Sequence, residues 1–164
     1  MFICFKNYFF SRLFNITLGE TMSELKKLIE EYIEIEDNFD EDNEEQKETL
    51  HRLGHEIDHA VYNEEFIIIY NADTEDEEVV ALIVSAEEDE AEEFFIPVYT
   101  DEQEANKAIE FFSSESEGDF AFDKANGNAI VQAYAEDDEF LGLAINAPQC
   151  DFVIFSENVH DCSE

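Results

Sequence analysis

Residues 94–112 read FFIPVYTDEQEANKAIEFF, and their hydrophobic pattern changes halfway along. The first part, residues 94–99, is almost entirely apolar, which is typical of a buried strand. Thr100 and Asp101 follow, and both favour helix N-caps because their side-chain oxygens accept hydrogen bonds from the first free N–H groups. Apolar residues then recur at helical spacing, namely Ala105, Ala108, Ile109 and Phe112. The stretch therefore predicts a strand, a cap and a helix in direct succession.

Pro97 lies inside the strand predicted for residues 94–99. Proline has no N–H to donate to a strand ladder, so within sheets it is found mostly on edge strands or at bulges. We therefore expect this strand to lie at an edge of the sheet or to contain a bulge.

The rest of the chain predicts five further strands and three further helices from apolar runs and helical periodicity. The strands are expected at 66–70, 79–84, 119–122, 140–145 and 152–155. The helices are expected at 24–33, capped by Ser23, at 44–62 and at 129–135, with a solvated acidic loop at 34–45. These elements predict the α+β class: one compact domain, with helices packed on a mixed, mostly antiparallel sheet of five to six strands.

The composition is strongly acidic, but it is not that of a disordered chain. The 164 residues include 44 Asp and Glu against 8 Lys and Arg, for a net charge of -36, and 45% of them are hydrophobic. A chain of this size and apolar content can bury a sizeable core within one domain. Its field repels nucleic-acid phosphates and anionic lipids, so we expect no direct binding of nucleic acid or membrane.

Three interpretations of the charge are open. Carboxylates occur in almost every segment, which favours general adaptation to a salty cytoplasm or an acidic proteome. The acidic surface could instead bind a basic protein partner. A third interpretation is a DNA-mimicking inhibitor, whose carboxylates would have to line one face at phosphate-like spacing.

The three cysteines, Cys4, Cys150 and Cys162, are odd in number and widely spaced. This pattern favours reduced thiols and a cytoplasmic protein. No pair is close enough in sequence to suggest a zinc knuckle.

Residues 1–21 differ from everything after them, because they hold two of the eight basic residues and a single acid, Glu20. We expect a misassigned start, with translation beginning at Met22; a membrane-interface helix is the alternative. Polar residues interrupt the apolar run, so it is too short to span a bilayer. The expected organisation is thus a doubtful extension at 1–21, a helix and acidic loop at 22–45, the α+β domain at 46–156 and a tail at 157–164.

Residues 55–59, HEIDH, match the HExxH pattern of zinc peptidases. In those enzymes two histidines one helical turn apart bind zinc, and the glutamate activates a metal-bound water. His51 would place a third imidazole on the same face. The metal ligands in this alternative are His55 and His59, and the catalytic residue is Glu56.

Other features oppose a zinc site. Asp58 is charged where that helix is normally buried, Gly54 weakens the helix before the motif, and every predicted strand lies downstream. No HxxGxxH continuation follows. We therefore expect no enzyme, no catalytic residue, no metal and no cofactor, and we retain the zinc-dependent hydrolase as the alternative.

Two blocks of sequence carry a resemblance to a known family. Residues 95–105, FIPVYTDEQEA, and 142–148, GLAINAP, resemble the strand–helix junction and the later Asn-Pro turn of the N-terminal domain of the SseB family. The matching positions are Pro97, Thr100, Asp101, Gly142, Asn146 and Pro148. The chain departs from the pattern at Tyr99, where Phe is usual, and at Ala147, which is inserted before the proline.

The resemblance covers about residues 45–156, without the C-terminal domain of longer members. It implies a compact α+β sheet with packed helices, no established catalytic activity or cofactor, and an adapter, regulatory or partner-binding role. Both motifs also have a structural interpretation, since the Thr/Asp cap fixes the start of a helix and the Asn/Pro turn fixes the last hairpin. We thus expect an acidic, cytoplasmic, SseB-like protein that binds another protein, with the zinc hydrolase and the DNA mimic as alternatives.

Overall fold

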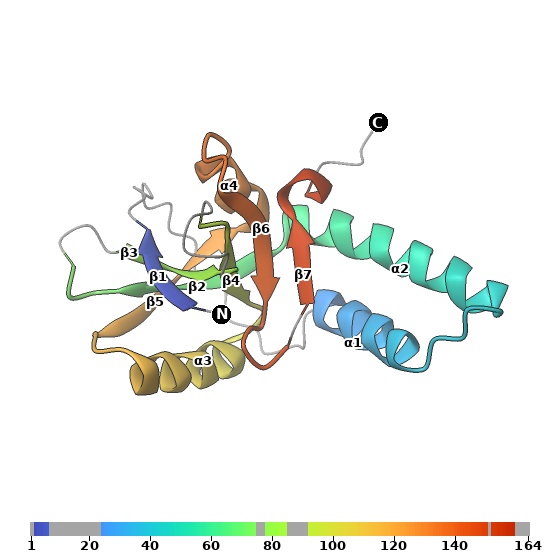
Figure 1. Ribbon diagram of the computed structural model, residues 1–164, viewed down its shortest axis with the longest axis horizontal. Helices are drawn as coiled ribbons and strands as arrows, with labels where there is room; N and C mark the ends of the chain where they lie inside the picture. The colour runs from blue at the N-terminus through green and yellow to red at the C-terminus, as the bar shows by residue number, and fades with distance from the viewer. Residues whose placement is uncertain (1, 7–23, 75–77, 85–91, 151, 160–164) are drawn as a thin grey trace.

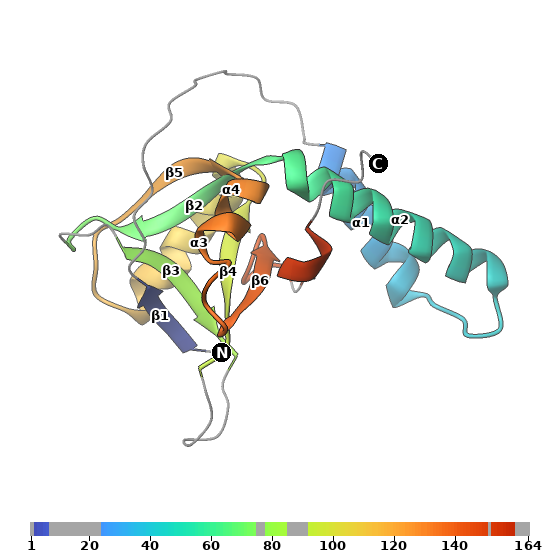
Figure 2. The same ribbon diagram turned by 90° about the horizontal axis from the view of Figure 1, so that it is seen from above.

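The computed structural model describes residues 2–6, 24–74, 78–84, 92–150 and 152–159, which form four α-helices, one short 3-10 helix and a seven-stranded sheet (Figures 1 and 2). The helices are α1 (Glu24–Asp37), α2 (Glu44–Asn63), α3 (Glu102–Glu115), α4 (Gly127–Ala133) and the 3-10 helix η1 (Ser156–Asn158). The strands are β1 (Phe2–Lys6), β2 (Glu65–Asn71), β3 (Glu78–Ile83), β4 (Phe94–Tyr99), β5 (Phe120–Asn126), β6 (Phe140–Ile145) and β7 (Phe152–Phe155). The predicted α+β class is confirmed, and β2–β7 correspond to the six predicted strands.

The sheet is mixed and mostly antiparallel. Its order is β1-β3-β2-β4-β6-β7, with β5 paired to β2, and β4–β6 is the parallel pair. One edge of β2 pairs along its whole length with β5, whereas β3 and β4 share the other edge. β3 also pairs with β4, so the sheet branches where these three strands meet.

The membrane-interface helix given as the alternative for residues 1–21 is wrong for residues 2–6, which form strand β1 and pair with β3 from Val79 to Ile83. The expected start at Met22, the predicted cap Ser23 and Cys162 lie outside the described residues.

Pro97 lies in an interior strand, so the predicted edge position is wrong. β4 pairs with β3 at Phe94 and Phe95 and with β2 at Val98 and Tyr99, and Pro97 lies between these contacts. Phe94 donates its N–H to the carbonyl of Glu139, in the segment that leads into β6. Successive residues of a strand direct their backbone groups to opposite sides, so the odd-numbered residues of β4, including Pro97, direct theirs toward β2 and β3. The register gives Pro97 no partner on that side, so its missing N–H removes no ladder hydrogen bond. The alternative prediction, a bulge in this strand, agrees with a shift of the register against β6 between Phe94 and Phe95.

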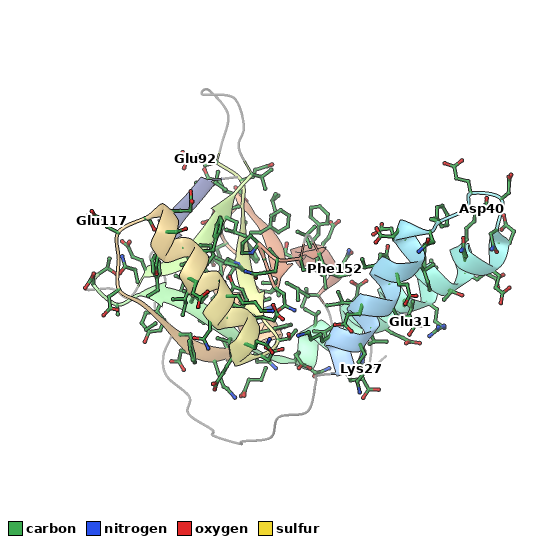
Figure 3. All side chains as sticks on the ribbon, turned by 90° about the horizontal axis from the view of Figure 1, so that it is seen from below. Lys27, Glu31, Asp40, Glu92, Glu117 and Phe152 are labelled. Carbon is green, nitrogen blue, oxygen red and sulfur yellow. The ribbon has the colours of Figure 1, made fainter. Side chains whose placement is uncertain are left out.

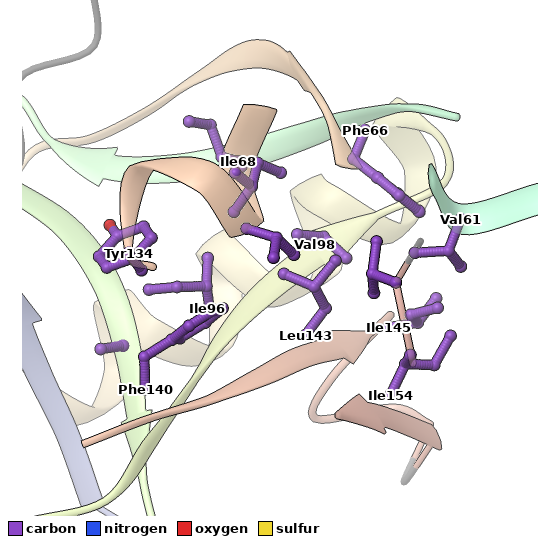
Figure 4. Packing of buried hydrophobic residues seen from close by; sticks show 14 of the residues in the cluster. Val61, Phe66, Ile68, Ile96, Val98, Tyr134, Phe140, Leu143, Ile145 and Ile154 are labelled. Atoms are coloured by element: carbon purple, nitrogen blue, oxygen red, sulfur yellow. The ribbon is translucent and has the colours of Figure 1, made fainter. Parts of the chain in front are cut away.

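Helices cover both faces of the sheet, which explains why its strands are continuous apolar runs. On one face, α3 packs Ala105, Ala108 and Phe112 against alternate residues of β2, β3 and β4. The other face packs against α1, α2 and α4, and Figure 4 shows part of this cluster. The residues labelled there are Val61, Phe66, Ile68, Ile96, Val98, Tyr134, Phe140, Leu143, Ile145 and Ile154.

Helices α1 and α2 form a hairpin that extends away from the sheet (Figures 1 and 3). The loop between them is shorter than the predicted 34–45, because α1 continues to Asp37 and α2 begins at Glu44. Asn38 closes α1 by donating its side-chain N–H to the Glu34 carbonyl, and Asn43 caps α2 by accepting from the N–H groups of residues 45 and 46. Within the described ranges, no helix has the length and apolar content needed to cross a membrane.

Candidate functional site

The two sequence blocks that carry the family resemblance meet in space at Thr100 and Asn146. The Thr100 N–H donates to Asn146 Oδ1 at 3.0 Å, and Asn146 Nδ2 donates to Thr100 Oγ1 at 3.1 Å. Asn146 is buried, and its own N–H donates to the carbonyl of Val98 at 2.8 Å. The ends of the parallel strands β4 and β6 are therefore joined through both backbone and side chains.

Asp101 is the N-cap of α3, and it is one of the two residues predicted for this position. Its Oδ1 accepts the N–H of Glu104 at 2.9 Å. Thr100 links the cap to the Asn146 turn, because its hydroxyl donates to Asp101 Oδ2 at 3.3 Å and its backbone N–H donates to Asn146. The predicted strand–cap–helix succession is confirmed, and the cap lies directly beside the Asn146 turn.

Lys26 of α1 connects this junction to the N-terminal helix. Its Nζ lies 3.1 Å from Asp101 Oδ2 and 3.0 Å from Glu104 Oε1. Lys107 lies 3.0 Å from the same Glu104 oxygen. We call these four residues the Lys26 clamp, because they hold the start of α1 against the start of α3.

The charged groups of the clamp stabilise one another in their ionised forms. Burial alone would raise the pKa of Asp101, but the hydrogen bonds from the Glu104 N–H and from Lys26 bring that pKa below its ordinary value. Burial likewise opposes ionisation of Glu104, yet Lys107 and Lys26 lower its pKa. Burial disfavours charge on Lys26 too, and its two carboxylate partners outweigh this and raise its pKa. All three groups are thus held in their charged forms.

Gly142 and Pro148 have structural roles in the sheet and in the turn after β6. Gly142 has a φ of 153°, and an added Cβ would lie 2.0 Å from the carbonyl oxygen of Ile154, so β7 can approach only a glycine there. Pro148 follows a cis peptide bond in the turn after β6, and Asn146 adopts a φ of 54° at the start of that turn. The turn closes through a hydrogen bond from the Cys150 N–H to the Asn146 carbonyl at 3.0 Å.

The HExxH residues lie on the exposed face of α2. His55, Glu56 and His59 are exposed, whereas Ile57 between them is buried in the core. Glu56 accepts a hydrogen bond from Arg52 at 2.8 Å. Catalytic zinc sites use three protein ligands. The described residues include no group of three or more His, Cys, Asp or Glu side chains placed to hold a metal ion.

Most of the few basic residues are held by carboxylates. Among the residues that the structure describes, five Lys and Arg form ion pairs: Lys26 and Lys107 in the clamp, Lys47 with Glu44, Arg52 with Glu56, and Lys124 with Glu65. The surface between these pairs is dominated by acidic side chains.

Sequence reasoning found Thr100, Asp101 and Asn146 but missed Lys26 and Glu104. Glu104 stands three residues after the cap Asp101, which is the spacing of a capping box and a readable signal. Lys26 gave no such signal, because its partners lie 75 and 78 residues away.

Comparisons of this chain with protein-family models, with curated proteins and with solved structures give no match.

Proposed function

We propose that this chain is an SseB-like, non-enzymatic domain that binds a basic protein partner and acts as an adapter or regulator in the cytoplasm. The observation that carries the proposal is the acidic end of the α1–α2 hairpin. Residues 34–48 contain nine Asp and Glu and one basic residue, Lys47. We call this segment the acidic tip.

The place of the acidic tip supports a binding role. It lies at the far end of a hairpin that extends beyond the sheet (Figure 1), so a partner can reach it without rearranging the core. Its loop also exposes an apolar side chain, Phe39, at 40%. Clustered charges of one sign accelerate association with a partner of the other sign and orient the encounter.

The charge also limits which partners fit. A net charge of -36 opposes association with nucleic acid, anionic lipid or a second acidic protein. A protein with a basic surface is attracted by the same field. Contacts made by exposed charges are screened by salt, so the complex should weaken as the ionic strength rises.

Affinity capture with the full chain tests the proposal. We expect a basic protein to be recovered at an ionic strength of about 0.15 M and lost as salt is raised severalfold. Failure to recover a partner at any salt concentration would contradict a binding role. A recovered protein that binds DNA, and is released by competing duplex DNA, would favour the DNA-mimicking form of the same function.

A further inference from the structure

Strand β7 has an apolar face that the described residues leave open. Its sequence, FVIF, is apolar at every position, which is typical of a strand buried on both faces. Ile154 is only 3% exposed, whereas Val153 and Phe155 on the other face are 43% and 46% exposed. One face of β7 is therefore packed and the other is apolar but uncovered.

The open face lies on the side of the sheet that carries α3. Phe155 contacts Phe95, with ring centroids 5.7 Å apart, and Phe95 belongs to the cluster beneath α3. Val153 stands opposite Ala144 of the same cluster. We call the exposed side chains of Val153 and Phe155 the β7 face; Phe95 and Ala144 lie buried beneath them.

Helix α3 covers the neighbouring part of this layer. It packs on β2, β4 and β5. Figure 3 views the molecule from the α3 side, with Phe152 marking β7, and no described helix lies over β6 and β7 there. Of these two strands only β7 presents exposed side chains on this side, because Ala144 of β6 is 4% exposed. A helix with its side chains is roughly 10–12 Å across. One helix beside α3 would complete the layer.

The charges around the β7 face select the occupant. None of β4, β6, β7 or η1 contains a Lys or Arg, and the neighbouring helix α3 contains one Lys, Lys107, paired with Glu104, against four Glu. Exposed acids stand at the ends of these elements, including Glu92, Glu93 and Glu157. A complementary ligand is therefore apolar on the face that meets Val153 and Phe155, and basic along its borders. A second copy of this chain would bring its own net charge of -36 and does not fit.

We infer that the β7 face binds an amphipathic, basic helix of the partner protein, side by side with α3. The inference rests on the proposed function, because it names the part of the basic partner that is recognised. The acidic surface attracts the helix, and the burial of Val153 and Phe155 fixes its position.

Two labelled peptides of about 14 residues, or roughly four turns, provide the probe. Both consist of Leu, Ala and Lys in the same amounts; one places Leu along a single helical face, and the other scrambles the order. Fluorescence anisotropy measures the Kd of each for the full chain. We expect the amphipathic peptide to bind about tenfold or more tightly than the scrambled one, because apolar burial adds to the charge attraction.

The double variant V153S/F155S should remove this preference and bind both peptides equally. The matched control V84S/F122S changes one Val and one Phe outside α3 and β7, 45% and 37% exposed, and should keep the preference. Circular dichroism and thermal melting establish that each variant is folded. The single variant V153S gives a milder change should the double variant be destabilised, and it should lower the preference in part.

The outcomes separate this inference from the proposed function. Equal binding of both peptides by the unmodified chain would overturn the β7 face while leaving charge-driven binding of a basic partner intact. Absence of binding by either peptide at low salt would contradict both. A chain that sediments as a dimer and dissociates in V153S/F155S would assign the face to a second copy and overturn the inference.

Discussion

Asn146 meets three structural requirements at one position. Its φ of 54° lies in the left-handed region, which Asn tolerates better than most residues. Its side chain accepts the Thr100 N–H and donates to the Thr100 hydroxyl. Its backbone N–H donates to β4, and its carbonyl accepts the Cys150 N–H that closes the turn. The turn after β6 and the segment that leads into the cap of α3 therefore depend on the same residue.

Replacement of Asn146 should destabilise the fold in two separable ways. N146A loses the side-chain hydrogen bonds and strains the left-handed backbone, at a cost of about 2–3 kcal/mol. N146G loses the same hydrogen bonds without the strain, so its cost should be about 1–2 kcal/mol. Chemical denaturation measures both. Equal stability of N146A and the unmodified protein would show that the junction contributes nothing.

The Lys26 clamp predicts a pH dependence with a definite sign. Asp101 and Glu104 have lowered pKa values when folded, so their contribution to stability is present above the unfolded pKa values and is lost as pH falls through the folded ones. K26M removes a partner of both carboxylates. The stability difference between the unmodified chain and K26M should therefore shrink from about pH 6 to about pH 3.

The neighbouring variant K27M is the control for K26M, since Lys27 is exposed and its replacement changes the net charge by the same amount. Comparing the two variants by denaturant titration at each pH cancels the general repulsion within the acidic chain. A K26M effect that matches K27M at every pH would refute the clamp.

At the scale of elements, the strands and helices were predictable because their signals are local. Apolar runs marked β2–β4, β6, β7 and the first half of β5, whereas helical periodicity marked α1, α2 and α3, with a predicted cap for α3. Pairing was not predictable, because it depends on contacts far apart in sequence: β5 returns to β2, and β6 adds to β4 in parallel. The edge position predicted for Pro97 failed for the same reason, because the branch of the sheet that accommodates the proline forms only where β2, β3 and β4 meet.

Two glycines should respond to alanine with opposite signs. G142A places a Cβ 2.0 Å from the Ile154 carbonyl oxygen at a φ of 153°, and should destabilise the fold by about 3 kcal/mol or more. In α2, the nearest atom to an added Cβ on Gly54 is Tyr32 Cε2 at 3.9 Å. G54A should therefore stabilise by about 0.5–1 kcal/mol through helix propensity. Thermal and chemical unfolding of the pair checks both signs, and a harmless G142A would contradict the close approach of β7.

The exposed α2 histidines lead to an expectation about metal content. Purified, untagged protein should contain far less than one zinc per chain by elemental analysis, because His55 and His59 lack a third ligand among the described residues. Stoichiometric zinc that is lost in H55A would contradict this and favour the hydrolase alternative.

At the scale of the whole molecule, the apolar core and the acidic tip lie in different parts of the fold. The sheet and its helices hold the apolar residues, and the α1–α2 hairpin extends a dense group of carboxylates away from them (Figure 1). The composition predicted the charge but not its place, because no local signal states that α1 and α2 pair as a projecting hairpin. The candidate binding surfaces, the acidic tip and the β7 face, could be located only with the tertiary structure.

Capture by two variants of equal charge tests the central claim most directly. The tip variant carries Gln at Glu34, Glu36, Glu41 and Glu48, and the control variant carries Gln at Glu110, Glu115, Glu117 and Glu136. All eight residues are exposed, and both variants lose the same number of charges. We predict that the tip variant loses most of the basic partner at about 0.15 M ionic strength while the control retains it. Equal retention by the two variants would contradict a binding role for the acidic tip.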